Sequence, residues 1–359
     1  MALRLPRVWR QAGYEVDLLC LDGEILGSSR FVDHVIQEAT AEDLFQRLIG
    51  ILRVNDARWQ AVVVVDEQLV RKLIASGDRA VLENWQPGAL DYEVGSFFLS
   101  KFGLEMVSKN PAMQIPPSRV CRTAEEIASF GESVGWPVIL KPANGSGGTG
   151  VVRYDSVIEL ETKLPLPELP VLAQKFIFGK EGVVEMFCSA GRPLAWLASH
   201  STRRMGGAFS YSTARMFLPK PELCPLVEQV ARFTNFEGFC GFDWIRDENT
   251  GIHWMIEFHP RASAGLRFAD RCGVDFSAAI VAAMTPGTAE FSPRVQMSGT
   301  SVAAHSFPWD LFRCLRDWDW RGLAMWLPGR NVHHDVFWDD SPLFKSWGRA
   351  RFRELFRMK

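Results

Sequence analysis

The sequence lacks several features that mark large classes of proteins. No apolar run reaches the ~18 residues that span a membrane, and no apolar signal-peptide core follows the N-terminus. The 40 basic and 42 acidic side chains nearly cancel to a net charge of −2, so the positive surplus typical of nucleic-acid binding is missing. Internal repeats and low-complexity tracts are also absent. These absences predict a soluble, cytoplasmic protein that has no nucleic-acid partner.

Cysteine is sparse and dispersed. The seven cysteines include no CxxC pair, and no histidine pair has zinc-binding spacing. An odd number of scattered thiols favours a reducing compartment over a disulfide framework. The chain has 359 residues, of which 47% are hydrophobic, so it is long enough to form two or three packed units.

The first 95 residues have the pattern of an open α/β unit. Residues 13–21 and 61–65 are short apolar runs typical of buried strands, and residues 41–52 between them repeat apolar side chains at helical spacing. Residues 1–12 already have a helical pattern, so the strand expected before them is missing. We assign residues 1–95 to this unit.

Three further units are predicted after residue 95. The first two consist of strands and hairpins interspersed with helices, and the third carries six tryptophans and a basic tail. In the first of these units, Thr123 and Glu126 form a capping box for a helix over 123–134. The predicted boundaries are 96–170, 171–290 and 291–359.

A glycine-rich turn, Asn144-Gly-Ser-Gly-Gly-Thr-Gly150, lies between two predicted strands. It matches GxGxxG literally, but a dinucleotide fingerprint needs a helix after the loop, and here a strand follows, so a nicotinamide oxidoreductase is disfavoured. A protein kinase needs HRD and DFG motifs, which are absent. Exposed N–H groups in such a turn suit phosphate binding, with Lys141 at the end of the preceding strand as a point charge. The alternatives are a merely glycine-rich turn and a surface lysine.

The late hairpin carries a pair of facing acids. If its turn centres near residue 250, Asp243 and Glu257 lie opposite each other, where two like charges repel. A divalent cation held between the two carboxylates removes that conflict. His259 shares their face, and the core face is predicted to carry Phe242, Trp244, Ile256 and Phe258. The alternative is two solvated carboxylates on an exposed sheet face.

Three segments, in this order and spacing, resemble the signatures of ATP-grasp enzymes. They are VILKPANGSGGTGVV, LAQKFIFGKEGVVEMF and GFDWIRDENTGIHWMIEFHPR. The resemblance covers roughly residues 96–280 and is greatest to the carboxylate–amine ligases of this superfamily. It implies a mixed α/β and α+β fold, in which an N-terminal open α/β pre-grasp domain precedes a two-lobed ATP-grasp fold.

The resemblance also implies a role for each matching position. Lys101 and Lys141 would contact the phosphates of ATP, together with the turn residues Gly145, Ser146, Gly147 and Gly148. The hinge that meets adenine would be Gln174, Lys175, Phe176 and Ile177, and Glu181 would bind the ribose. Asp243 and Glu257 would bind Mg²⁺, and Arg261 would face the transferred phosphate, which its forked guanidinium suits.

His259 departs from this pattern, because the family has asparagine at that position. An imidazole is a poorer magnesium ligand than an amide oxygen and favours softer ions, so the metal is Mg²⁺ or Mn²⁺, with His259 as a third ligand. This departure also keeps open a non-catalytic protein that binds nucleotide and has lost turnover. Another alternative is that His259 hydrogen-bonds a substrate or a neighbouring carboxylate.

The resemblance implies an ADP-forming ligase that activates a small carboxylic acid as an acyl phosphate and joins it to an amine. We expect one of Arg203, Arg204 and Arg215 to hold the substrate carboxylate, with ordinary surface charge as the alternative. The tail over 344–359 combines six basic side chains with apolar ones. It could contact an anionic membrane surface, although a docked C-terminal helix is the favoured reading.

Overall fold

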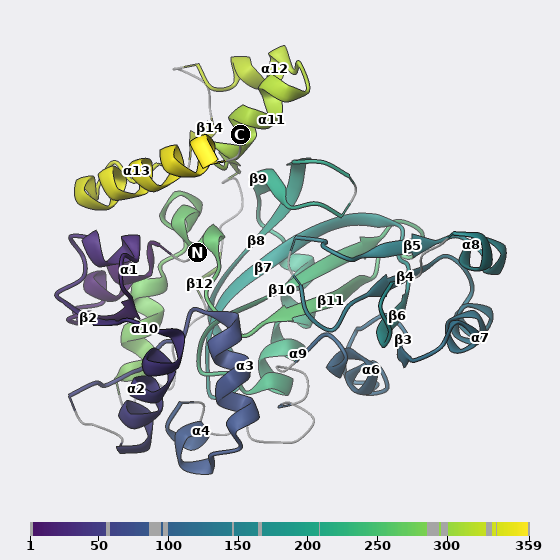
Figure 1. Cartoon of the computed structure of the whole chain (residues 1–359), viewed down its shortest axis with the longest axis horizontal. Helices are drawn as coiled ribbons and strands as arrows, with labels where there is room; N and C mark the ends of the chain where they lie inside the picture. The colour runs from purple at the N-terminus through teal and green to yellow at the C-terminus, as the bar shows by residue number, and fades with distance from the viewer. Residues whose placement is uncertain are drawn as a thin grey trace.

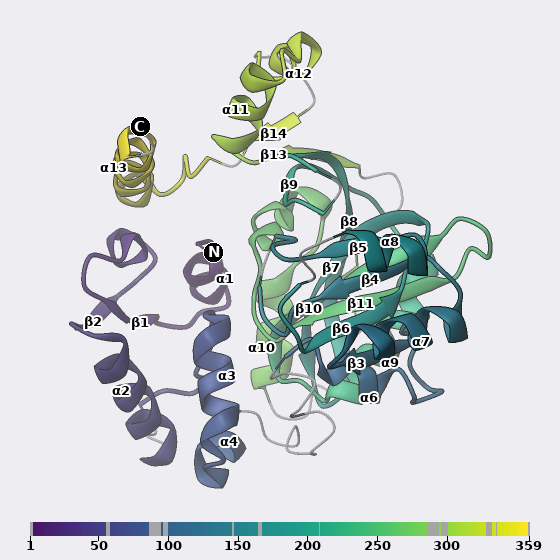
Figure 2. The ribbon, with the colours of Figure 1, turned by 45° about the vertical axis from the view of Figure 1, so that its right-hand side comes forward.

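The structure is a computed structural model that describes residues 3–54, 58–85, 95, 100–145, 147–163, 167–207, 209–285, 294–295, 301–327, 332–334 and 336–357. Side chains are described for all of these except 294–295 and 351–357. An N-terminal unit, a small lobe, a large sheet and a C-terminal extension follow one another along the chain (Figure 1). The N-terminal unit lies on one side of the large sheet and the helices of the small lobe lie on the other (Figure 2). The mixed α/β fold predicted from the sequence is confirmed.

The N-terminal unit packs α2 against a two-stranded parallel sheet. The apolar stripe predicted for α2 is buried as expected, because its side chains contact α3 and α4. The elements are α1 (Leu5–Gln11), β1 (Asp17–Leu21), η1 (Ile25–Ser28), β2 (His34–Glu38), α2 (Ala41–Val54), α3 (Glu67–Ser76) and α4 (Arg79–Trp85).

The strand expected at residues 61–65 is wrong. These residues are described and carry no strand, and the partner of β1 is the more polar β2. Val64 is nevertheless buried against α2 and α3. A short apolar run reports burial, and burial alone does not decide whether a backbone joins a sheet.

The small lobe contains an antiparallel sheet in the order β3-β6-β4-β5. The predicted cap of α7 is present, since the Thr123 hydroxyl accepts from the Glu126 N–H. The boundary expected at residue 170 falls one strand too early, because β6 pairs with β3 and β4 rather than with the large sheet. The elements are α6 (Gly103–Val107), β3 (Ser118–Cys121), α7 (Ala124–Val134), β4 (Val138–Lys141), β5 (Val152–Tyr154), α8 (Val157–Thr162) and β6 (Val171–Lys175).

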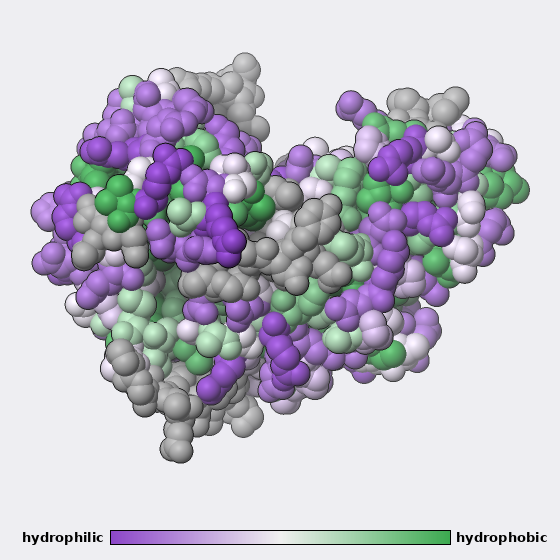
Figure 3. Space-filling view, turned by 90° about the horizontal axis from the view of Figure 1, so that it is seen from below, coloured by the Kyte–Doolittle hydropathy of each residue, from purple (hydrophilic) through white to green (hydrophobic). Residues whose placement is uncertain are grey.

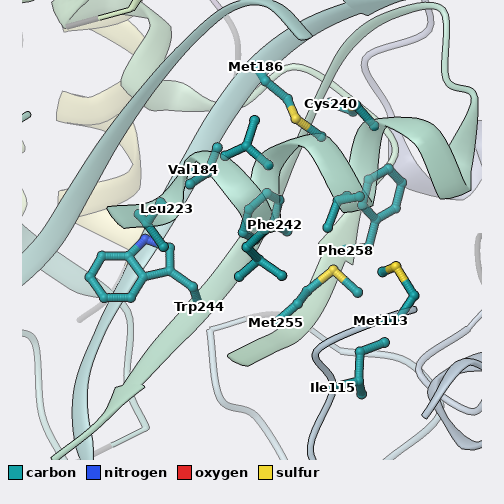
Figure 4. Close-up of a cluster of buried hydrophobic side chains, with 14 of the residues drawn as sticks. Met113, Ile115, Val184, Met186, Leu223, Cys240, Phe242, Trp244, Met255 and Phe258 are labelled. Carbon is teal, nitrogen blue, oxygen red and sulfur yellow. The ribbon is translucent and has the colours of Figure 1, made fainter. Parts of the chain in front are cut away.

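The large sheet runs in the order β11-β10-β7-β8-β9-β13-β14, and β12 also pairs with β8. One face packs on α9 and on the connector that contains Met113 and Ile115, around Phe242 and Trp244 (Figure 4). The other face is covered at one end by α10 and α1. The elements are β7 (Gly179–Ser189), β8 (Arg192–Arg204), β9 (Ser212–Phe217), η2 (Pro221–Leu223), α9 (Cys224–Thr234), β10 (Gly238–Asp247), β11 (His253–His259), η3 (Ala264–Phe268), η4 (Asp270–Cys272), α10 (Phe276–Met284) and β12 (Arg294–Val295).

The C-terminal extension joins the large sheet through β13, which pairs with β9. Its last helix is docked along its first turns, since Leu343 and Trp347 are buried with Phe337 and pack against Ile25. Among the described helices, none combines the length and the apolar character needed to cross a membrane. The elements are β13 (Val302–His305), α11 (Trp309–Arg316), α12 (Trp320–Ala324), β14 (Val332–His334) and α13 (Ser341–Arg357).

Candidate functional site

The hairpin of β10 and β11 brings the two predicted acids together. Asp243 and Glu257 are direct cross-strand partners, as the position of the turn predicts. One detail of the prediction is wrong, because a bulge follows this pair and Trp244 faces Met255 instead of Ile256. Met255 therefore takes the core position predicted for Ile256 (Figure 4). We call the sheet face that carries Asp243 and Glu257 the site face.

Each facing carboxylate already has a partner. Glu257 Oε1 lies 2.9 Å from Lys101 Nζ, and Asp243 Oδ1 lies 3.1 Å from His259 Nε2. Burial opposes ionisation of Asp243, but His259 and Arg215 outweigh it and lower the pKa of this carboxyl. Burial likewise opposes protonation of His259, and Asp243 nevertheless raises its pKa. The repulsion between the two acids is therefore offset by neighbouring cations.

The pair Asp243 and Glu257 fits a magnesium ion that is shared with a phosphate. Mg²⁺ in proteins is commonly held by one or two carboxylates and completes its shell with phosphate oxygens and water. In the described part of the chain, no three His, Cys, Asp or Glu side chains form a ready-made metal site. The Nε2 atom of His259 is engaged by Asp243, a contact of the kind that orients a carboxylate, and the role of His259 as a metal ligand stays a prediction.

Lys141 is buried between the small lobe and the late hairpin. Its Nζ donates to Gln174 Oε1 at 2.8 Å and to the Ile256 carbonyl oxygen at 3.1 Å. Only 6% of the residue is exposed, and burial lowers the pKa of its ammonium to about 8 even though Glu257 acts in the opposite direction. A buried cation with a lowered pKa beside two acids is typical of a binding or catalytic site.

Lys101 joins the glycine-rich turn to the acidic pair. Besides Glu257, its Nζ contacts the Gly145 carbonyl oxygen at 2.7 Å. The turn needs glycine at Gly147 and Gly148, which have φ angles of 61° and 78°. A Cβ on Gly148 would lie 1.8 Å from the Phe209 carbonyl oxygen, so the turn approaches the β8–β9 loop closely. Ser146, predicted with this turn, lies outside the described residues.

The predicted hinge follows β6. Gln174 is buried and holds Lys141 through its Oε1 atom, while its Nε2 atom donates to Ser118 Oγ at 2.9 Å. The Phe176 N–H donates to the Pro137 carbonyl oxygen at 3.1 Å. The Arg153 guanidinium lies over the Phe176 ring, 4.5 Å from its centroid. The remaining predicted hinge residues are the exposed Lys175 and the buried Ile177.

The three arginines predicted for the substrate have different partners. Arg204 forms an ion pair with Glu181, the residue predicted to bind ribose. Arg215 is close enough to Asp243 and Glu185 for their charges to act on its pKa, which burial lowers. Arg203 instead pairs with Asp310 of the C-terminal extension at 3.2 Å. Arg204 and Arg215 therefore lie at the site face, whereas Arg203 has a partner in the extension.

The N-terminal unit supplies residues that the sequence did not reveal. Glu67 at the start of α3 accepts from Arg261 at 3.2 Å and is also paired with Arg71. Burial opposes ionisation of Glu67, but Arg261 and Arg71 lower the pKa of its carboxyl. Glu67 and Arg71 have helical i,i+4 spacing, but nothing in the sequence links them to Arg261, which lies 194 residues away.

Glu67 and Arg71 border an opening between the N-terminal unit and the late hairpin. It is lined by Glu67, Arg71, Ser100, Lys101, Leu104, Glu257, Phe258 and Pro260. In the view from below, a notch separates the left and right parts of the molecule at the upper edge (Figure 3). The opening places both cations and carboxylates within reach of a small ligand.

Glu185 is a buried acid near the site that the sequence analysis missed. Only 5% of this β7 residue is exposed, and burial raises the pKa of its carboxyl. It lies opposite Gly241, two residues along β10 from Asp243, and so shares the site face. Alternation along β7 could have suggested this position, but no motif distinguishes Glu185 from its neighbours.

Comparisons with known proteins concern the domain and the fold. Residues 100–265 match the profile of the ATP-grasp domain. The arginine-specific large chain of carbamoyl phosphate synthase from Bacillus subtilis (strain 168) is 25% identical over 158 residues, which is 40% of this chain and 15% of that protein. The chain thus spans only a small part of the length of this curated relative.

Two solved structures share the fold over most of the chain. The biotin carboxylase domain of the 2-oxoglutarate carboxylase from Hydrogenobacter thermophilus, in complex with MgADP and bicarbonate, gives a TM-score of 0.60 at 16% identity. The match covers 84% of this chain and 70% of that one. The L-amino acid ligase from Bacillus licheniformis gives a TM-score of 0.56 at 17% identity, covering 81% and 75%. At such identities the likeness concerns the fold.

Proposed function

Residues 100–265 match the ATP-grasp domain, and on that premise we propose that the protein is an ADP-forming, ATP-dependent carboxylate–amine ligase. One observation carries the proposal above all. Asp243 and Glu257 face each other across one hairpin, and Lys101 and Lys141 reach that hairpin from the small lobe. Acids that would hold a metal and cations that would hold phosphates thus lie close together between two lobes, which is what phosphoryl transfer requires.

In the proposed reaction, the γ-phosphoryl group of ATP moves to an oxygen of the substrate carboxylate, and ADP leaves. The amine nitrogen then attacks the carbonyl carbon, phosphate departs, and the proton lost by the amine goes to solvent. Such chemistry asks the protein mainly for positioning and charge neutralisation. Lys101 and Lys141 would neutralise the phosphates, and the N–H groups of the glycine-rich turn would close over them.

A magnesium ion held here would supply charge neutralisation during phosphoryl transfer. Asp243 and Glu257 would hold it, with His259 orienting Asp243 through the 3.1 Å contact. Arg261 would meet the transferred phosphate once its pairing with Glu67 is exchanged for the substrate. Phe176 and Ile177 would line the adenine pocket at the hinge, and Glu181 would bind the ribose after parting from Arg204.

The substrates are proposed to be a small carboxylic acid and an amine. The L-amino acid ligase and the bicarbonate-bound carboxylase share the fold, so amino acids and bicarbonate are the first acids to test. Arg215 is the best candidate for the substrate carboxylate, because it lies beside Asp243. The seven cysteines are all free thiols, which supports a reducing compartment such as the cytoplasm.

The test is an ADP-release assay with MgATP and a panel of amino acids and small carboxylic acids, with hydroxylamine added to trap an acyl phosphate. We expect acid-dependent ADP release and a hydroxamate product. Release of AMP and pyrophosphate would contradict the mechanism. Tight ATP binding without ADP release would favour the non-catalytic alternative.

A matched pair of variants distinguishes loss of the acidic pair from a general effect on the folding of the hairpin. Glu257→Gln removes one facing acid, whereas Glu248→Gln changes an exposed acid in the turn of the same hairpin. We expect the first variant to lose ADP release and the second to keep it. Equal activity in both variants would refute the role of the acidic pair.

A further inference from the structure

The C-terminal extension contains a fully buried carboxylate that organises its surroundings. Asp310 in α11 has no exposed surface. Its Oδ1 atom accepts from Thr213 Oγ1 at 2.9 Å and from Arg313 Nε at 3.1 Å. Its Oδ2 atom accepts from Arg203 Nη1 at 3.2 Å and from Trp326 Nε1 at 3.3 Å. One buried charge is thus satisfied by donors from four places in the chain.

Two of these donors come from the hairpin formed by β8 and β9. Arg203 lies near the end of β8 and Thr213 near the start of β9, so Asp310 binds both strands where they enter the loop. The Ser306 N–H adds a bond of 2.8 Å to the Thr213 carbonyl oxygen. The loop between Arg203 and Thr213 is therefore held at both ends by the extension.

That loop borders the proposed nucleotide site. The Phe209 carbonyl oxygen lies so close to Gly148 that no side chain would fit there, and Tyr211 lies 3.7 Å from the Cβ position of Gly147. At the base of the loop, Arg204 pairs with Glu181. Tyr211 also contacts Trp309, the residue before Asp310, with ring centroids 6.2 Å apart. The loop is thus in contact with both the glycine-rich turn and the extension.

We propose that Asp310 is a positioning residue for nucleotide binding, which holds the β8–β9 loop against the glycine-rich turn. The C-terminal extension is then a working part of the ATP site, although it lies outside the matched ATP-grasp region. This inference rests on the proposed function. Asp310 touches no substrate and acts through Arg203 and Thr213.

The experiment compares Asp310→Asn with Asp319→Asn. Asp319 binds Arg313 Nη2 at 2.8 Å and caps α12 through the Gly322 N–H, so its variant perturbs the same extension while leaving the bonds to β8 and β9 intact. MgADP binding is measured by calorimetry. Trypsin cleavage after Arg203 and Arg204 is followed by mass spectrometry, because it reports the loop without requiring activity.

We expect Asp310→Asn to weaken MgADP binding roughly tenfold, the size of effect typical when a charge-assisted hydrogen bond is lost, and to speed cleavage in the loop. Asp319→Asn should change neither quantity. If Asp310→Asn fails to fold, Trp309→Ala replaces it, because it removes the ring contact to Tyr211 and keeps the Asp310 carboxylate. Weaker MgADP binding by that variant would also support the inference.

The outcomes separate a failure of the proposed function from a failure of the inference about Asp310. If the unaltered protein binds no MgADP, the proposed function fails and the inference fails with it. If the unaltered protein binds MgADP and Asp310→Asn binds equally well with unchanged cleavage, the inference alone is overturned. Equal losses of MgADP affinity in Asp310→Asn and Asp319→Asn would show that Asp310 only stabilises the extension, and would also overturn the inference.

Discussion

Raising the pH from 7 to 9 should weaken nucleotide binding through Lys141. Burial lowers the pKa of this ammonium to about 8, whereas an ordinary lysine titrates near 10.5. The proposed function requires the charged form, because only an ammonium neutralises phosphate. Below the lowered pKa the lysine is charged and binding is strong. Above it the free protein has lost the proton that the complex needs.

The size of the effect follows from the titration. A group with a pKa of about 8 is about nine-tenths protonated at pH 7 and about one-tenth protonated at pH 9. Bound phosphates favour the charged form and return the pKa toward its ordinary range. The dissociation constant for MgADP should therefore rise about tenfold between pH 7 and pH 9, which corresponds to about 1.4 kcal/mol of binding free energy.

Calorimetry at pH 7, 8 and 9 measures the affinity, and buffers of different ionisation enthalpy measure proton uptake. Near pH 8, about half a proton should be taken up for each nucleotide bound. Lys141→Arg keeps its charge throughout this range, so its affinity should not vary with pH. Lys109→Met, at an exposed position of the same lobe, should keep the wild-type profile.

Two results would refute this reasoning. One is an affinity that does not change between pH 7 and pH 9. The other is a tenfold loss of MgADP affinity between pH 7 and pH 9 in Lys141→Arg, equal to the loss in the unaltered protein, because the titrating group would then lie elsewhere. An affinity that falls as the pH rises, but with no proton uptake on nucleotide binding, would also exclude Lys141 as the cause.

The remaining predictions concern the metal, the turn and the docked helix. Asp243→Asn should lower the Mg²⁺-dependent kcat at least ~100-fold, since even mutation of a residue that only supports a metal ligand lowers metal affinity or activity about 10–100-fold. A metal titration of activity checks this. His259→Asn should lower the ratio of activity with Mn²⁺ to activity with Mg²⁺, because an amide oxygen suits Mg²⁺ better than an imidazole does. The same ratio in the variant and the unaltered protein would contradict this prediction. Gly148→Ala should raise the KM for ATP and lower the thermal stability, because its Cβ would collide with the Phe209 carbonyl oxygen. Asp340→Ala should reduce the free energy of unfolding by about 2 kcal/mol in denaturant titrations, because it removes a buried acceptor for the Ser29 hydroxyl and the backbone N–H groups of residues 30 and 343.

Some of the fold could be predicted because its signals are local. The apolar stripe of α2 and the capping box at Thr123 depend on residues three or four positions apart, where helical geometry alone sets the contact. The pairing of Asp243 with Glu257 follows from the position of a single turn. Sequence patterns are reliable where one element, or one hairpin, contains the whole interaction.

Other features had no local signal. β6 follows a proline-rich stretch and was assigned to the second lobe, yet it pairs with β3 and β4. The bulge that puts Met255 in place of Ile256 breaks the alternation on which the prediction depended. Pairing partners and bulges depend on how whole elements pack together, and a pattern within one segment cannot report that.

The amino-acid sequence by itself determined which residues could bind phosphates and metal, because charge, glycine freedom and strand alternation are properties of short segments. Only the tertiary structure decided that Glu67 would hold Arg261 and that Arg203 would turn to Asp310, 107 residues away. Those contacts join separate units of the chain. They exist because buried charges must find partners once the units pack together, and the partner is whichever group the packing brings within reach.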